Sequence, residues 1–405
     1  MLQLGNNTRS STLIFAGIVL VIILFFAFAI HFIMADNIVG NDILVFYLAA
    51  KSSFIDGQGP YLSENAVLSQ VLSYGKPAQP GEDYLTFSYP PYALIPIWIL
   101  TFLPFHWVQA LWMAALIIGF VFGLFILFPH APKWLAPSAL LIYPVAFGIL
   151  MGNFVIPISI ILLSNIKYFF FNNNKPNQVI EYVLAISLAW ATVKPQFSWL
   201  FIAFILISAF SQKKRNFILS FFLSLFIFLL LSFLIQPDWV SAFIKQISFY
   251  QQTNPTELQI IKFLNLFLPA RISEMAAIPL IVIAILWVFY AFYQWWHNKL
   301  KTLSVFIIIG WVSYLLYPGG VDYQQIIFVL PFLLWIFQWK PTKPILVTIV
   351  WVLIILFSWL EFIYVRILGL NPGVTGWLFY GYLLWAVVLL THKDKTSDPR
   401  IAPKI

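Results

Sequence analysis

The chain has 405 residues, of which 62% are hydrophobic and only 9% are charged, and its net charge is +8. A water-soluble domain carries roughly 25% charged residues, so this composition excludes a soluble protein. The basic residues stand in short clusters between apolar blocks, as in 213–215, which is typical of membrane loops and excludes a nucleic-acid-binding surface. Cysteine is absent, which excludes disulfides and thiolate metal sites.

Long apolar blocks predict a single all-α membrane domain over 1–405, a bundle of about twelve transmembrane helices. The blocks lie at 12–34, 107–128, 134–150, 154–171, 179–194, 196–211, 216–235, 277–296, 303–317, 323–338, 345–365 and 375–391. The first block exceeds the ~7–15-residue core of a cleavable signal, which favours an uncleaved anchor helix. Several others are shorter than the ~20 residues of a full span, and such helices can line a water-accessible cavity.

A further apolar block, 90–105, carries prolines near both ends and inside, so we predict an interfacial or re-entrant helix there. With that block excluded, every cluster of Lys and Arg falls on one side of the membrane, which the positive-inside rule makes cytoplasmic. The clusters are 172–178, 212–216, 297–301, 339–343 and the basic tail 392–405, together with the N-terminus and Arg9. This topology indicates a multi-pass protein of the bacterial inner or plasma membrane.

Two long loops are then non-cytoplasmic, 35–106 and 236–276. The first holds six of the 14 acidic residues of the chain, among them Asp42 and the pair Glu82-Asp83. Neither loop is long enough for an independent domain. We expect amphipathic helices that lie on the membrane, for example over 41–55, where apolar residues recur at helical spacing.

Charged residues are almost absent from the middle of the predicted spans, which counts against an ion-coupled transporter. Polar residues gather instead at the predicted non-cytoplasmic mouth of the bundle. The candidate site residues there are Asp42, Lys194, Gln196, Asp322, Tyr323, Tyr89 and, in the second loop, Arg271. With no His cluster and no Asp-x-Asp motif, we expect neither a metal nor any other cofactor.

Each candidate residue also has a plain structural interpretation. Asp42 opens a helical segment, so it acts either as a helix cap or as a general base beside a cavity. Lys194 either snorkels to the interface or binds a lipid phosphate as a point charge. Asp322 follows a Gly turn and suits an N-cap, and Glu82-Asp83 is expected to be a solvated loop pair.

The order of short motifs along 35–340 resembles glycosyltransferase family 87, membrane transferases of the GT-C superfamily related to bacterial polyprenyl-phosphate-mannose-dependent alpha-mannosyltransferases. The motifs are Gly40-Asn41-Asp42, Tyr47-Leu48-Ala49-Ala50, Gly57-Gln58-Gly59-Pro60-Tyr61, Phe87-Ser88-Tyr89-Pro90-Pro91, Leu111-Trp112, Gly152-Asn153, Ala191-Thr192-Val193-Lys194-Pro195 and Asp322-Tyr323 ahead of Leu330-Pro331. Where this family often has Gly-Gln, the chain has Gly152-Asn153.

The resemblance implies a GT-C-type fold and a hexosyltransferase, with mannose the favoured sugar. Such an enzyme moves the sugar from a polyprenyl-phosphate donor to a hydroxyl of a glycolipid or glycan acceptor at the non-cytoplasmic face, with inversion. Asp42 would deprotonate the acceptor, and a cation such as Lys194 would stabilise the leaving phosphate. The expected partners are this donor, this acceptor and membrane lipids.

Three other hypotheses remain open. A multi-span lipid or sugar translocase would need a polar path across the whole bundle. A glycan polymerase or ligase that uses a diphospholipid donor would need more cations at the outer mouth, for which Lys194, Arg271 and Arg366 are candidates. A structural subunit of an envelope complex would need no chemistry of its own.

Overall fold

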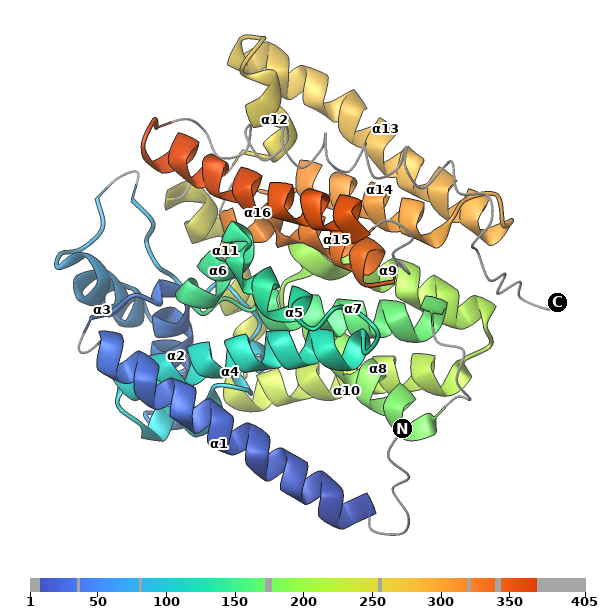
Figure 1. Cartoon of the computed structure of the whole chain (residues 1–405). Helices are drawn as coiled ribbons and strands as arrows, with labels where there is room; N and C mark the ends of the chain where they lie inside the picture. Colours follow the sequence, from blue (N-terminus) through green and yellow to red (C-terminus); the bar gives the residue numbers. More distant parts are fainter. Residues whose placement is uncertain are drawn as a thin grey trace.

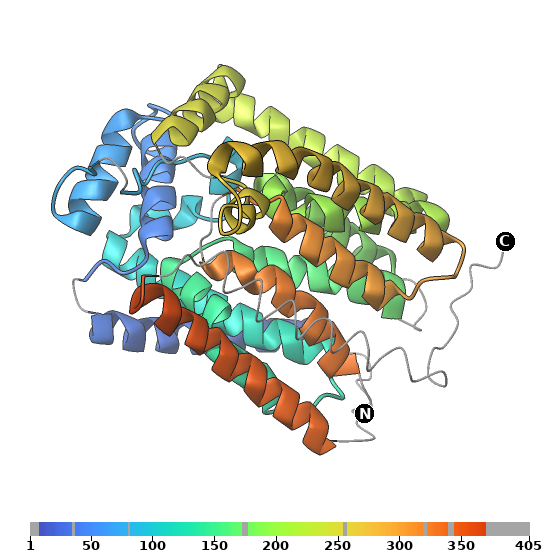
Figure 2. The ribbon, with the colours of Figure 1, turned by 90° about the horizontal axis from the view of Figure 1, so that it is seen from above.

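A computed structural model describes residues 8–34, 37–79, 82–171, 177–253, 257–318, 322–338 and 344–369. Within these ranges the chain is helical and has no β-strand, apart from an isolated antiparallel bridge between Leu258 and Pro318. The long helices run side by side along one direction of the molecule (Figures 1 and 2). The prediction of an all-α bundle is therefore confirmed.

The first half of the chain contains the longest loop between two apolar helices. Its elements are α1 (Thr8–Met34), α2 (Asn41–Phe54), α3 (Ser63–Tyr74), η1 (Pro91–Leu94), η2 (Trp98–Phe102), α4 (Phe105–Leu127), α5 (Leu135–Ser138), η3 (Ala139–Leu141), α6 (Tyr143–Met151), α7 (Val155–Phe171), α8 (Gln178–Trp190) and η4 (Ala191–Val193).

The second half repeats this alternation of apolar helices and short connecting elements. Its elements are α9 (Pro195–Ser211), α10 (Arg215–Ile235), α11 (Trp239–Thr253), α12 (Gln259–Leu264), α13 (Ala270–Trp296), α14 (Thr302–Leu315), η5 (Asp322–Gln325), α15 (Ile326–Gln338) and α16 (Pro344–Arg366).

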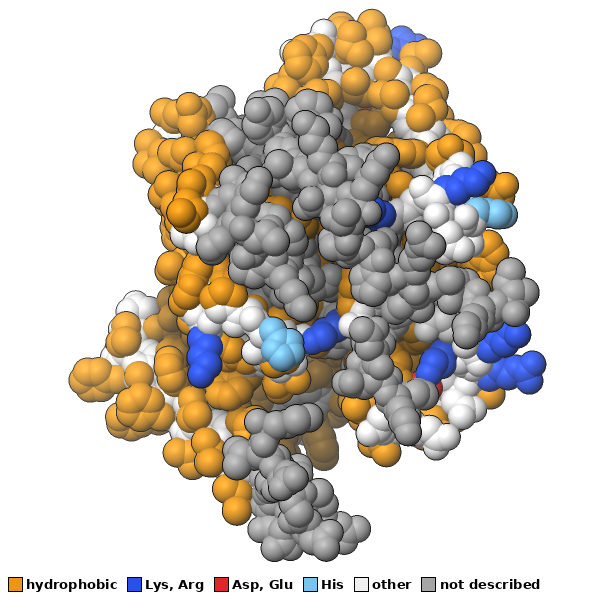
Figure 3. Space-filling model, turned by 45° about the vertical axis from the view of Figure 1, so that its right-hand side comes forward, with side chains coloured by type: hydrophobic (Ala, Val, Ile, Leu, Met, Phe, Trp, Pro, Cys, Tyr) orange, Lys and Arg blue, Asp and Glu red, His pale blue; other side chains and the backbone are white. Residues whose placement is uncertain are grey.

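Among the described residues, four helices are long and apolar enough to cross a membrane, and their spanning parts are Ile14–Met34, Phe105–Leu127, Arg215–Ile235 and Ala270–Trp296. Six further apolar helices are shorter. These helices turn large hydrophobic side chains outward, and hydrophobic side chains cover most of the described surface in Figure 3. Such a surface requires an apolar surrounding, which is compatible with a membrane protein. The number of twelve spans stays a prediction, and the block 375–391 lies outside the described residues.

Two apolar blocks differ from continuous helices. The block 90–105 forms η1 and η2, which have four and five residues and are too short to cross a membrane. The block 134–150, which we expected to be one span, is broken into α5, η3 and α6. Ile142, the residue before α6, has an extended backbone (ψ 120°), and Pro144 lies in the first turn of α6, where a proline is tolerated.

The prediction that 41–55 lies on the membrane as an amphipathic helix is wrong. The helix exists as α2, but all residues from Ile43 to Ala50 are buried. Phe46 stacks on Phe154 with a ring separation of 4.0 Å and contacts Phe87 edge-on. Because apolar side chains surround α2 on all sides, it belongs to the core of the bundle.

Helices of the two long loops gather at one end of the bundle, at the left of Figures 1 and 2. There, aromatic contacts join α11 to the first loop, between Tyr61 and Phe243 and between Tyr84 and Phe249. The start of α8 lies at the other end, where Glu181 forms an ion pair with Lys214 and accepts a hydrogen bond of 2.6 Å from the Tyr168 hydroxyl.

The sharp turn between α6 and α7 depends on Gly152. Its φ is +72°, and a Cβ atom there would lie 2.7 Å from Cβ of Ile43 on α2. The carbonyl of Gly152 also accepts a hydrogen bond of 2.8 Å from Trp112 Nε1. Only glycine fits this close approach, which holds the next residue, Asn153, against the start of α2.

We expect Gly152→Ala to destabilise the protein by about 2–4 kcal/mol, because it combines a left-handed backbone with an overlap in the core. The matched control is Gly119→Ala within α4, where an added Cβ meets no atom within 4 Å. Thermal unfolding in detergent measures both variants. Equal melting temperatures for the two variants would contradict the role of Gly152.

Candidate active site at one end of the helical bundle

Asp42 stands in the first turn of α2, and a buried glutamine fixes the backbone that leads to it. Gln109 of α4 accepts hydrogen bonds of 2.9 Å from both Val39 N and Gly40 N. Its amide nitrogen donates to the carbonyl of Asn37 over 3.1 Å. The approach to α2 is therefore fixed by α4 before the helix begins.

A continuous chain of hydrogen bonds links Asp42 to Lys194, and we call these two residues with Asn153 the polar triad. Asn153 Nδ2 donates to Asp42 Oδ2 over 2.8 Å, and Lys194 Nζ donates to Asn153 Oδ1 over 3.1 Å. Asn153 and Lys194 are 0% and 1% exposed, whereas Asp42 is half-buried. The triad therefore ties together the start of α2, the turn before α7 and the turn between η4 and α9.

The plain structural interpretations of two residues do not hold. The N-cap of α2 is Gly40, no side chain caps this helix, and the carboxylate of Asp42 is turned to Asn153 instead. Lys194 does not snorkel to an interface, because its whole side chain is buried. Burying an ammonium costs free energy unless hydrogen bonds or an opposite charge compensate it. The placement of Asp42 and Lys194 therefore indicates a polar site inside the bundle.

Tyrosine rings enclose the ammonium of Lys194. Its Nζ lies 5.1 Å from the ring centre of Tyr323 and 6.0 Å from that of Tyr89. Both separations suit a cation–π attraction, which stabilises a desolvated cation. Tyr323 also lies close enough to Asp42 to lower the pKa of this carboxyl group, and Asn153 acts in the same direction on the pKa of Tyr89. Of the predicted site residues, Tyr89 and Tyr323 therefore lie directly against the triad.

Burial raises the pKa of Asp42 above its ordinary value, an effect that the charge of Asp83 reinforces. The hydrogen bond from Asn153 and the positive charge of Lys194 act in the opposite direction and keep this pKa from rising further. Burial also lowers the pKa of Lys194 to about 8, against the opposing charge of Asp42. Lys194 remains mostly protonated at neutral pH. The arrangement is a carboxylate held above its usual pKa beside a buried cation, as a general base requires.

The second loop and the residues after α14 add polar groups that sequence reasoning missed. Burial, and then the charges of Asp83 and Asp42, raise the pKa of Tyr250 on α11. Tyr317 is buried and lies close enough for the charge of Asp42 to raise its pKa and for Gln196 to lower it. Gln196 therefore joins the site through Tyr317. No pattern in the sequence singles out Tyr250 or Tyr317 among its 18 tyrosines.

Glu82 and Asp83, which we expected to be a solvated loop pair, have different surroundings. Glu82 forms an exposed salt bridge of 3.4 Å with Lys76, as expected of a loop. Asp83 is exposed, but its Oδ1 accepts a hydrogen bond of 3.0 Å from Leu85 N, and its charge acts on Asp42 and Tyr250. Asp83 therefore borders the site, which its sequence context did not indicate.

Two predicted site residues are not brought to the triad by the described contacts. Arg271 is exposed in the first turn of α13, and none of the described contacts joins it to Asp42, Asn153 or Lys194. Asp322 begins η5, but its side chain lies outside the described part of the chain, as do those of Glu361 and Arg366. Their predicted roles stay predictions.

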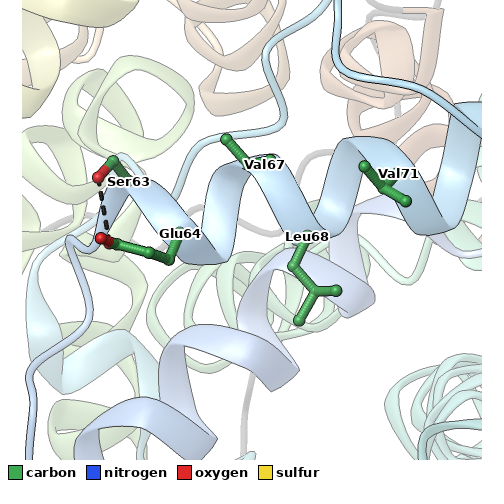
Figure 4. A pocket seen from close by; sticks show the side chains of 5 residues that line it. All are labelled: Ser63, Glu64, Val67, Leu68 and Val71. Atoms are coloured by element: carbon green, nitrogen blue, oxygen red, sulfur yellow. Dashed lines mark hydrogen bonds between the residues drawn. The ribbon is translucent and has the colours of Figure 1, made fainter.

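A shallow hollow lies over one face of α3 and is lined by Ser63, Glu64, Val67, Leu68 and Val71 (Figure 4). The hydrogen bond drawn there joins Ser63 to Glu64, and the hollow contains no residue of the triad. Among the described residues, no group of three or more His, Asp or Glu side chains could hold a metal ion. The expectation that no metal takes part stays a prediction.

Comparison of the chain with protein-family models, with curated protein sequences and with solved structures finds no match.

The lowered pKa of Lys194 predicts a specific pH dependence of stability. Lys194 loses its proton near pH 8 when folded and near pH 10.5 when unfolded, so the unfolded chain binds more protons between these values. The folded state therefore gains stability as the pH rises from 8 to 9.5. At about 1.4 kcal/mol per pH unit, the gain is roughly 1–2 kcal/mol.

Lys194→Met removes this titration, so the variant does not gain stability between pH 8 and 9.5. The difference in stability between the wild type and the variant should therefore increase in favour of the wild type. Thermal unfolding at pH 7, 8 and 9.5 measures the difference. Lys245→Met, at an exposed lysine of α11, serves as control and should follow the wild-type curve. A Lys194→Met curve parallel to the wild type would contradict the buried ammonium.

Proposed function

We propose that the protein is a membrane glycosyltransferase that moves a hexose, with mannose favoured, from a polyprenyl-phosphate donor to a hydroxyl of a glycolipid or glycan. The observation that carries the proposal is the polar triad, a carboxylate linked through one amide to a buried ammonium. The motif resemblance to glycosyltransferase family 87 agrees with it, since Asp42, Lys194 and Tyr323 belong to the motifs concerned, whereas Asn153 stands where the family often has Gln.

In the proposed reaction, Asp42 takes the proton of the acceptor hydroxyl. The hydroxyl oxygen then forms a bond to the anomeric carbon of the sugar, on the face opposite the phosphate. The bond between the anomeric carbon and the phosphate oxygen breaks, and its electron pair leaves with the polyprenyl phosphate. The configuration is inverted. A base aligned with the acceptor typically contributes 10²–10⁴-fold to such a rate.

Lys194 is suited to the leaving phosphate by its remaining donors. An ammonium carries three N–H groups, and the described hydrogen bonds use one of them, on Asn153. In the proposal the other two bind the donor phosphate, which requires Tyr89 and Tyr323 to move and give access to an ammonium that is 1% exposed. A cation that is already desolvated needs no reorganisation when negative charge develops on the leaving group, so it favours the transition state.

The translocase alternative is less well supported, because α8 separates the two polar ends by apolar side chains. Glu181 lies in the first turn of α8, and Lys194 follows η4. About 20 Å of helix separates the two residues. The buried residues of α8 between them are Leu184, Ala185, Leu188 and Ala189. The buried side chains of α8 between the two ends therefore line no polar path.

The proposal includes the location of the site. The positive-inside rule assigns the basic segments 212–216 and 297–301 to the cytoplasm, which puts the start of α2 at the non-cytoplasmic face of a bacterial plasma membrane. Nucleotide sugars are confined to the cytoplasm, so a site on the outer face needs a sugar donor carried by a lipid. This requirement agrees with a phosphate-binding cation at the same end of the bundle.

Asp42→Asn should lower the rate of sugar transfer by about 10²–10⁴-fold, because the amide cannot take the proton of the acceptor. The measurement is transfer of radiolabelled sugar by the purified protein from polyprenyl-phosphate mannose to a glycolipid extract. Asp56→Asn, in the exposed loop after α2, is the control and should keep full activity.

Two outcomes would contradict the proposal, and they are separate. If a well-folded Asp42→Asn variant transfers sugar at the wild-type rate, Asp42 is not the base. If the wild-type protein transfers no mannose, glucose, galactose or arabinose from a polyprenyl phosphate to any lipid of the extract, the proposed activity is wrong.

A further inference from the structure

A groove of about 220 Å³ lies between α13 and α14, near the C-terminal end of α13. The wall on α13 consists of Trp287, Tyr290, Ala291 and Gln294. Ile308 of α14 and Leu300 form the opposite side, and Lys299 completes the lining. None of the lining residues belongs to the polar triad, and none of the described contacts joins them to it.

The shape of the groove follows from the order of residues on α13. Trp287, Tyr290 and Gln294 lie on one face of the helix at spacings of three and four residues. Ala291, between them, is buried and small, so it leaves a recess beside two large rings. Trp287 and Tyr290 are 48% and 59% exposed, which indicates that α14 does not cover them.

Lys299 is fixed at the mouth of this groove by the way α13 ends. Asn298 has a φ of +56°, Asn298 N donates to Trp295 O over 2.9 Å, and Lys299 N donates to Gln294 O over 2.8 Å. These two bonds form a Schellman motif, which places Lys299 directly after the helix. A further hydrogen bond of 3.1 Å from Trp295 Nε1 to Thr302 Oγ1 ties the turn to the start of α14.

The charged residue among those that line the groove is Lys299, and none of the lining residues is acidic. The turn 297–301, to which Lys299 belongs, also contains no acidic residue. Lys, Arg and His side chains also stand out at the right-hand edge of Figure 3, where Asp and Glu are scarcely visible. The occupant that complements this end of the groove is therefore anionic.

We infer that the groove between α13 and α14 binds one phospholipid with an anionic headgroup. The phosphate lies against the ammonium of Lys299, the glycerol and ester region lies against Trp287 and Tyr290, and one acyl chain follows the recess beside Ala291. Aromatic side chains with a polar edge suit the headgroup level of a bilayer, and basic pockets between transmembrane helices suit anionic lipids. The inference requires α13 to cross a membrane but does not depend on glycosyl transfer.

The experiment is native mass spectrometry of the purified full chain in detergent, titrated with phosphatidylglycerol or with phosphatidylcholine of the same acyl chains. Phosphatidylglycerol should bind the wild type in a one-to-one complex and at least about fivefold more tightly than phosphatidylcholine. Lys299→Gln should weaken this binding by about fivefold, the effect of about one lysine–lipid charge interaction. Lys245→Gln, at an exposed lysine on α11, should leave it unchanged.

A second variant separates a lipid from a free anion. Trp287→Ala removes part of the apolar wall and keeps Lys299, so it should weaken the lipid while the charge of the groove is unchanged. Inorganic phosphate at millimolar concentration should not displace the lipid. The inference is overturned if both lipids bind equally, if Lys299→Gln binds phosphatidylglycerol as the wild type does, or if phosphate displaces it.

Discussion

The hydrogen bond between Asn153 and Asp42 is the interaction on which the candidate site depends. Through it, the amide of Asn153 links the carboxylate of Asp42 to Lys194, which is 1% exposed and donates to the oxygen of the same amide. Without this bridge, a buried ammonium would lack its one described hydrogen-bond acceptor, which is costly in an apolar core. The fold provides for it with Gly152, the residue before Asn153, whose left-handed backbone lets the turn approach α2.

The same interaction gives the two charged groups their chemical character. Burial raises the pKa of Asp42, and Asn153 and Lys194 limit the rise, so the carboxylate is more basic than that of an ordinary aspartate. Tyr89 and Tyr323 shield the cation from water by their rings. These groups come from segments far apart in the sequence, so the site forms only when the bundle is assembled. A base and a desolvated cation are the parts that an inverting transfer from a lipid phosphate needs.

Sequence reasoning found the helical class, the apolar blocks and four residues at or beside the triad, because hydropathy and the rarity of charge are local signals. It missed what depends on three-dimensional packing. The helix at 41–55 was expected on the membrane surface, but aromatic contacts such as that of Phe46 with Phe154 bury it. Asn153 was noted only as a departure from a motif, and Tyr250 and Tyr317 reach the site through the folding of the second loop, which no periodicity reveals.

The pH dependence of the proposed sugar transfer in Asn153→Leu tests the central claim most directly. Leucine has nearly the shape of asparagine but cannot donate to Asp42, so the pKa of the carboxylate should rise. The acidic limb of the pH–rate profile should then move to higher pH than in the wild type, because the base must be ionised to act. An acidic limb at the same pH in a folded, active variant would contradict the account, since Asp42 would then not be the base that Asn153 controls.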